Sequence, residues 1–78
     1  MVGILKILER EELTSTQKVI LIILEVIPEG ESISFNELAF YTSLTRKTII
    51  SNLNKLEDAG YIQVFRNSTN KNSYKILI

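Results

Sequence analysis

Two capping-box motifs determine where the first helices of this chain can begin. Residues 14–17 read Thr-Ser-Thr-Gln, and residues 34–37 read Ser-Phe-Asn-Glu. In each motif the first side chain can accept a hydrogen bond from the amide three residues later, whose own side chain reaches back. The first helix should end near Ile27, because Pro28 disfavours helical geometry in the residue before it. Residues 32–34 leave room for only a very short strand between the two helices.

A third helix with one buried face should follow. Thr45 is its N-cap candidate, and Ile49, Leu53 and Leu56 recur at i, i+4 and i+7. Gly60 is typical of the position after a helix, where the backbone takes a left-handed conformation. We therefore expect a helix that begins at Thr45 and ends just before Gly60.

The C-terminal residues have the composition of a β-hairpin. Residues 61–65 and 73–78 are rich in β-branched and aromatic side chains and bracket a polar tip at residues 67–72. The order helix, short strand, helix, helix, hairpin predicts an α+β fold. Its core would consist of three helices, with the hairpin at the C-terminus.

The composition argues against catalysis and against a membrane span. The 78 residues include no Cys and no His, so thiolate metal sites, disulfides and the commonest general base are absent. The longest apolar run covers residues 19–24, far short of the roughly 20 residues that a membrane-spanning helix needs. The N-terminus lacks the pattern of a signal peptide. We therefore expect a cytoplasmic protein that is not an enzyme, with no cofactor, metal or small-molecule ligand.

Charge is distributed unevenly along a chain whose net charge is zero. Residues 1–43 contain three basic and seven acidic side chains, net −4, whereas residues 44–78 contain six basic and two acidic, net +4. A contiguous basic segment favours an anionic partner for the C-terminal half.

Three stretches carry a resemblance to known proteins: Glu37-Leu38-Ala39, Leu44-Thr45-Arg46-Lys47-Thr48-Ile49, and Leu56-Glu57-Asp58-Ala59-Gly60-Tyr61-Ile62 preceded by Leu53. Over residues 14–78 the chain resembles the winged helix-turn-helix superfamily. That superfamily includes regulators of the multiple-antibiotic-resistance and arsenical-resistance types and the N-terminal domains of some plasmid and phage replication initiators. The resemblance implies that the small Ala39 lets two helices approach, that Leu44 fills the turn, and that the helix at residues 45–59 reads DNA. Ser43 stands where many members have Gly.

The residues expected to contact DNA lie on this helix and on the hairpin, or wing, at residues 66–75. On a helical wheel, the residues roughly opposite the apolar face are Lys47, Ser51, Asn54, Lys55 and Asp58. Lysines suit phosphates, and Asn54 has the donor and acceptor pair that fits adenine. The expected DNA-binding residues are Thr45, Arg46, Lys47, Ser51, Asn54, Lys55, Arg66, Asn70, Lys71 and Lys75. A soluble helix face and a solvated turn would have a similar composition.

The first helix is more apolar than one buried face requires. Ile20, Ile23, Leu24 and Ile27 form one stripe that can cover the core, and a second stripe lies beside it. Residues 1–13 form an N-terminal helical extension with further apolar residues. It either folds back on its own chain or meets a second copy, and we expect a homodimer through Ile4, Leu5, Leu8, Val19, Ile22 and Val26.

The sequence therefore favours sequence-specific binding of double-stranded DNA by an intracellular, nucleoid-associated transcriptional regulator. A DNA binder in replication or plasmid maintenance is a close alternative. A winged helix that docks proteins is the rival from another class, because winged helices serve both roles.

Overall fold

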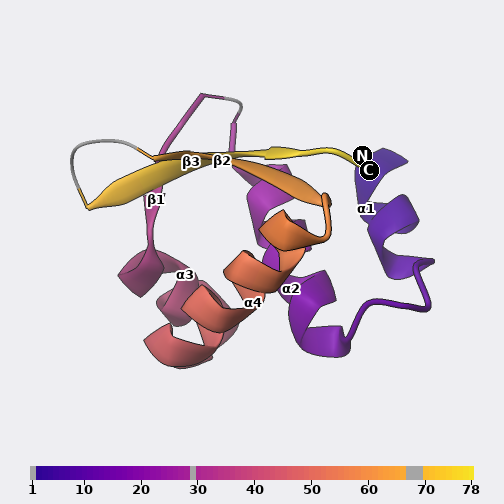
Figure 1. Ribbon diagram of the computed structural model, residues 1–78, viewed down its shortest axis with the longest axis horizontal. Coiled ribbons are helices and arrows are strands. Elements are labelled where there is room, and N and C mark those ends of the chain that lie inside the picture. The colour runs from indigo at the N-terminus through magenta and orange to yellow at the C-terminus, as the bar shows by residue number, and fades with distance from the viewer. Residues whose placement is uncertain (1, 29, 67–69) are drawn as a thin grey trace.

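The computed structural model describes residues 2–28, 30–66 and 70–78. Four helices are followed by a hairpin, with one short strand between the second and third helices (Figure 1). The helices are α1 (Val2–Leu8), α2 (Ser15–Val26), α3 (Phe35–Thr42) and α4 (Arg46–Asp58). The strands are β1 (Ile33–Ser34), β2 (Ile62–Arg66) and β3 (Lys71–Ile76).

Both expected capping boxes are present. The Thr14 hydroxyl accepts from the Gln17 amide at 3.1 Å, and the Gln17 side chain accepts from the Thr14 amide at 3.1 Å. The same two bonds at the start of α3 join Ser34 and Glu37, each at 3.0 Å. These contacts satisfy amides that a helix start leaves unpaired, so both helices begin where the sequence predicts.

Two residues with positive φ end the helices of the motif. Ser43, after α3, has a φ of 59°, and Gly60, after α4, has a φ of 83°. Gly60 takes this conformation without a steric cost, whereas Ser43 adopts the left-handed region that non-glycine residues rarely enter. The turn between α3 and α4 therefore forms with Ser at the position where the resemblance indicated Gly.

The three strands form one antiparallel sheet in the order β1-β3-β2. Val64 pairs with Tyr74 in the hairpin, and Ile33 pairs with Asn72 on the other edge of β3. In Figure 1 the sheet runs along one side of the molecule with the helices beneath it. Part of the expected polar tip, residues 67–69, lies outside the described residues.

The core lies between the helices and the sheet. The buried set contains residues from α2, α3, α4, β1 and β2 together with two from the N-terminal segment: Ile7, Leu13, Ile20, Leu21, Leu24, Ile33, Leu38, Ile49, Leu53, Leu56 and Ile62. Ala39 and Leu44 pack against this set, as the resemblance implied. The arrangement is α+β, and it confirms the predicted winged helix-turn-helix fold with an additional N-terminal helix.

The N-terminal segment packs on its own chain. Ile7 is 1% exposed and Leu13 is 7% exposed. The Lys18 ammonium donates to the Leu8 carbonyl at 2.8 Å, where the end of α1 leaves acceptors without helical partners. Ile7, which the sequence analysis did not single out, is therefore the residue that anchors α1.

The two stripes expected on α2 need one correction. Ile22, assigned to the stripe that a second copy would cover, packs half-buried against the core of its own chain. Because α1, α3, α4 and β3 all contact α2, much of its circumference finds apolar partners within the chain. Of the second stripe, Val19 and Val26 stay exposed.

Candidate nucleic-acid interface

The outer face of α4 is solvent-exposed along its length. Arg46, Lys47, Ser51, Asn54 and Lys55 are all exposed. The apolar face opposite them, formed by Ile49, Leu53 and Leu56, is buried. One face of α4 therefore packs in the core, and the face that was predicted to contact DNA is open to solvent.

The three cations of α4 have no acidic partner. Arg46, Lys47 and Lys55 form no ion pair within residues 2–28, 30–66 and 70–78. The guanidinium of Arg46 lies over the Phe35 ring, 5.7 Å from its centroid. An external anion can therefore bind these cations without breaking an ion pair that the structure describes.

The Thr45 hydroxyl is occupied as the N-cap of α4. It accepts from the Thr48 amide at 3.2 Å and donates to the Thr48 hydroxyl at 2.9 Å. A phosphate at this helix start would therefore meet backbone amides rather than a free Thr45 hydroxyl.

Arg66 on the wing is held by an acid of α4. Its two terminal nitrogens donate to the two Glu57 oxygens at 3.0 and 2.8 Å, a paired geometry typical of Arg and carboxylate. The hydrogen bonds from Arg66 lower the pKa of Glu57, and the same contact raises the pKa of Arg66. Both groups are therefore charged at neutral pH.

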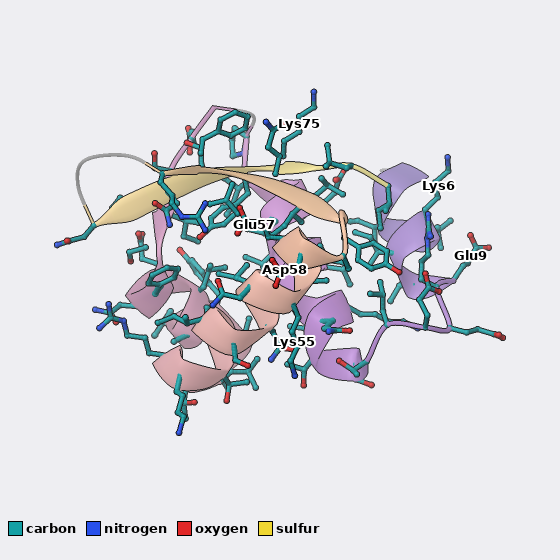
Figure 2. All side chains as sticks on the ribbon, viewed as in Figure 1. Lys6, Glu9, Lys55, Glu57, Asp58 and Lys75 are labelled. Atoms are coloured by element: carbon teal, nitrogen blue, oxygen red, sulfur yellow. The ribbon has the colours of Figure 1, made fainter. Side chains whose placement is uncertain are left out.

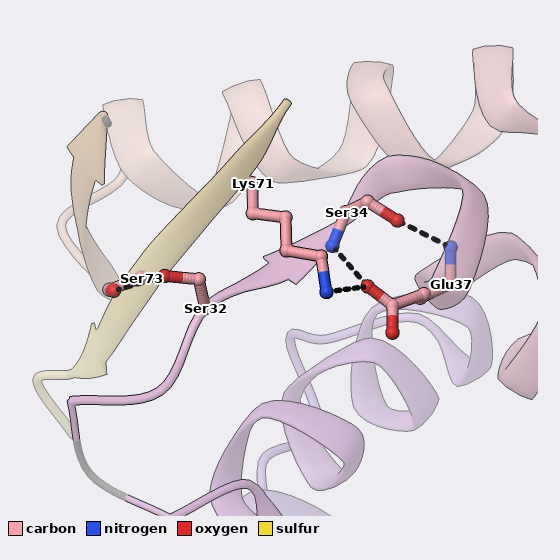
Figure 3. A network of polar contacts seen from close by, with 5 residues as sticks. All are labelled: Ser32, Ser34, Glu37, Lys71 and Ser73. Carbon is pink, nitrogen blue, oxygen red and sulfur yellow. Dashed lines mark hydrogen bonds and ion pairs between the residues drawn. The ribbon is translucent and has the colours of Figure 1, made fainter. Parts of the chain in front are cut away.

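Lys71, the other described cation beside the wing tip, is held by an acid of α3. Its ammonium lies 3.2 Å from Glu37 Oε1, the same oxygen that accepts from the Ser34 amide (Figure 3). The bond from the Ser34 backbone, followed by the contact with Lys71, lowers the pKa of Glu37. Nearby, the hydroxyl of Ser32, just before β1, and the hydroxyl of Ser73 in β3 lie 3.2 Å apart and form a further hydrogen bond. The wing is thus fixed to both helices of the motif.

The remaining expected wing residues lie in different places. Asn70 is exposed and lines a hollow between the wing and the motif. Lys75 is exposed and projects from the side of the sheet away from the helices, whereas Lys55 lies on the opposite side of the molecule in Figure 2. The fold therefore brings Asn70 close to the start of α4 but does not bring Lys75 together with Lys55.

Several features of this surface could not be predicted from the sequence. Phe40 and Tyr41 on α3 are 80% and 59% exposed, with their rings edge to face and centroids 5.6 Å apart. Their place among apolar residues at the end of a helix gave no sign of exposure. The partners of Arg66 and Lys71 were equally hidden, because only the packing of the wing on the motif brings these charges to the glutamates.

The chain matches the model of a known domain family. The family model described as a helix-turn-helix domain matches residues 11–62, which include α2, β1, α3 and α4. No curated protein and no solved structure matches the chain significantly. Among the residues that the structure describes, no helix is long and apolar enough to cross a membrane.

Proposed function

Because the chain belongs to the helix-turn-helix domain family, a membership that supports DNA binding, we propose that it binds double-stranded DNA sequence-specifically and regulates transcription. In this role it would act like the regulators of the multiple-antibiotic-resistance and arsenical-resistance types, within the cell and on the nucleoid. Its role is binding and not catalysis.

The exposed outer face of α4, with three uncompensated cations, is the observation that carries this proposal. Thirteen residues give a helix about 20 Å long at a rise of about 1.5 Å per residue. The major groove, about 12 Å wide, admits such a helix. With α4 in the groove, the cations on its exposed side come within reach of the phosphates that border it.

Each residue on this face has a role that fits its chemistry. Lys47 and Lys55 neutralise phosphates, while Arg46 reaches either a phosphate or a guanine edge. Asn54 can donate to and accept from one adenine. Ser51 is small and allows the helix backbone to approach the bases. The wing, held close to the motif, then lies along the backbone or the adjacent minor groove.

We further propose that the protein acts as a homodimer. Leu5, Leu8, Val19 and Val26 are each at least 42% exposed although they are apolar. In Figure 1, α1 lies at the opposite end of the long axis from the start of β3, so pairing through α1 would leave the wing free. Two α4 helices would then read an inverted repeat with half-sites about 34 Å apart.

The test is a selection of randomised duplexes followed by titration of the selected site. The wild type should enrich one sequence, and its affinity should fall steeply with salt because bound phosphates release counterions. Asn54→Ala should relax preference at one base pair by about 1 to 3 kcal/mol while nonspecific binding persists. No enrichment and no salt-dependent binding to any duplex would refute the proposed function.

Sedimentation equilibrium tests the dimer. Removing the N-terminal segment would also remove Ile7 from the core, so the sharper variant is Leu5→Glu at an exposed position, with Lys6→Glu as a matched control. A dimer that becomes a monomer in the first variant alone would place the interface on α1. A wild-type monomer at tens of micromolar would refute the dimer.

The exposed pair Phe40 and Tyr41 favours a second candidate, a module that docks a protein. Aromatic residues are enriched at protein interfaces, and this pair lies on α3 rather than on α4. The variant Phe40→Ser, Tyr41→Ser separates the two functions. Under the leading proposal it binds the selected duplex as the wild type does.

A further inference from the structure

A hollow of about 210 Å³ lies where the helices of the motif meet the wing, and it is lined by Ser34, Phe35, Asn36, Arg46 and Asn70. These residues come from the start of α3, the first turn of α4 and the position just before β3. Three separate parts of the fold therefore converge on one open site. Arg46 and Asn70 are among the residues that the sequence predicted to contact DNA, whereas Phe35 and Asn36 are not.

Arg46 gives this hollow a positioned positive charge. Its guanidinium lies over the Phe35 ring, 5.7 Å from the centroid, and this contact restricts the side chain. An arginine over an aromatic ring keeps the donors at its edge available, and those donors match two oxygens of one phosphate. Arg66 and Lys71 differ from Arg46, because each of them already has a carboxylate.

The other polar groups of the hollow are suited to donating hydrogen bonds. Asn36 and Asn70 are exposed, and each carries an amide that can donate two hydrogen bonds. The nearby acid, Glu37, is already engaged by the Ser34 amide and by Lys71. The hollow thus combines one uncompensated cation with neutral donors from the motif and from the wing.

We propose that this hollow binds one phosphate of the DNA backbone, with Arg46 as the charged donor and Asn36 and Asn70 as neutral donors on either side. The proposal rests on the proposed function, because α4 in the major groove brings the bordering backbone to this position. A phosphate held by both the motif and the wing would fix the register of α4 along the groove without reading any base.

The proposal is tested on one fixed duplex of about two helical turns, over a range of salt concentrations. Arg46→Gln should reduce the slope of log affinity against log salt by about 0.9, the value for one phosphate contact. Asn36→Ala and Asn70→Ala should each weaken binding about 3- to 10-fold with the slope unchanged, as expected for one neutral hydrogen bond. Circular dichroism confirms that each variant is folded.

Double variants distinguish one shared phosphate from separate contacts. When Asn70→Ala is combined with Arg46→Gln, the loss should be smaller than the product of the two single losses, because both remove support from the same group. The matched control combines Asn70→Ala with Lys47→Gln, whose losses should multiply.

Two results overturn the proposal in distinguishable ways. If the wild type binds duplex DNA but the two asparagine variants bind equally well, or their losses multiply with that of Arg46→Gln, the hollow is not a phosphate site and DNA binding stands. If the wild type binds no duplex, the proposed function fails and this inference fails with it.

Discussion

Replacing Glu57 with Gln should strengthen DNA binding, because it releases a cation that the fold now neutralises. Arg66 is bound through two hydrogen bonds to Glu57, yet its side chain is 61% exposed. Once released, it needs only a change of rotamer to reach solvent or a phosphate. One additional phosphate contact steepens the slope of log affinity against log salt by about 0.9. If the contact contributes nothing at 1 M salt, this slope corresponds to about 8-fold tighter binding at 0.1 M salt.

The control for this variant is Asp58→Asn. Asp58 is the neighbouring exposed acid and forms no ion pair within the described part of the chain, so its replacement removes the same charge without releasing a cation. Affinity is measured by fluorescence anisotropy on one duplex at several salt concentrations. Glu57→Gln should give a larger gain and a steeper slope than Asp58→Asn.

Equal gains in affinity from the two variants would refute the predicted release of Arg66, since the effect would then be a general loss of negative charge. The prediction is also refuted if Glu57→Gln weakens binding, since the pair would then serve DNA binding by holding Arg66 in place. The double variant Glu57→Gln, Arg66→Gln tests whether Arg66 causes the gain in affinity. The gain should disappear in this variant, because the guanidinium of Arg66 is then absent.

Three further predictions concern stability. Ser34→Ala should cost about 1 kcal/mol of unfolding free energy in a thermal melt, because it removes the cap of α3. Ile7→Ala should cost about 2 to 5 kcal/mol in urea, because the side chain is fully buried, whereas Leu5→Ala should change the monomer's stability by less than about 0.5 kcal/mol. The melting temperature should fall as pH drops through the lowered pKa values of three glutamates, because carboxylates with depressed pKa stabilise the fold above their unfolded pKa and lose that contribution in acid. They are Glu12, Glu37 and Glu57, each below the ordinary value of 4.5.

Local signals in the sequence predicted the secondary structure well. The capping boxes at Thr14 and Ser34 form as the sequence predicted, because such motifs involve only residues within one helical turn. The left-handed Gly60 and the buried face of α4 follow from equally short-range patterns. These features need no knowledge of the rest of the chain, so they could be read without the fold.

Contacts between distant segments could not be predicted in the same way. Tyr61 donates to Glu12 at 2.8 Å across 49 residues of sequence, and no periodicity connects the two. Ile7 gave no sign that it would be more buried than its apolar neighbours, because the choice depends on how α1 rotates on α2. Burial of a short segment is decided by tertiary packing, and a pattern of apolar residues leaves several rotations equally acceptable.

The internal ion pairs explain how a chain of zero net charge can present a positive surface. Glu57 and Glu37 pair with two cations of the wing, Arg66 and Lys71, so neither acid offsets the unpaired cations that the structure describes on α4. Along α4 those charges are not uniform. Arg46 and Lys47 occupy the first turn, where the helix dipole is also positive, whereas Lys55 is followed by the exposed Asp58. The positive potential is therefore strongest at the N-terminal end of α4, beside the hollow. Because phosphates are negatively charged, this gradient favours an orientation in which the N-terminal end of α4 lies closest to the DNA backbone.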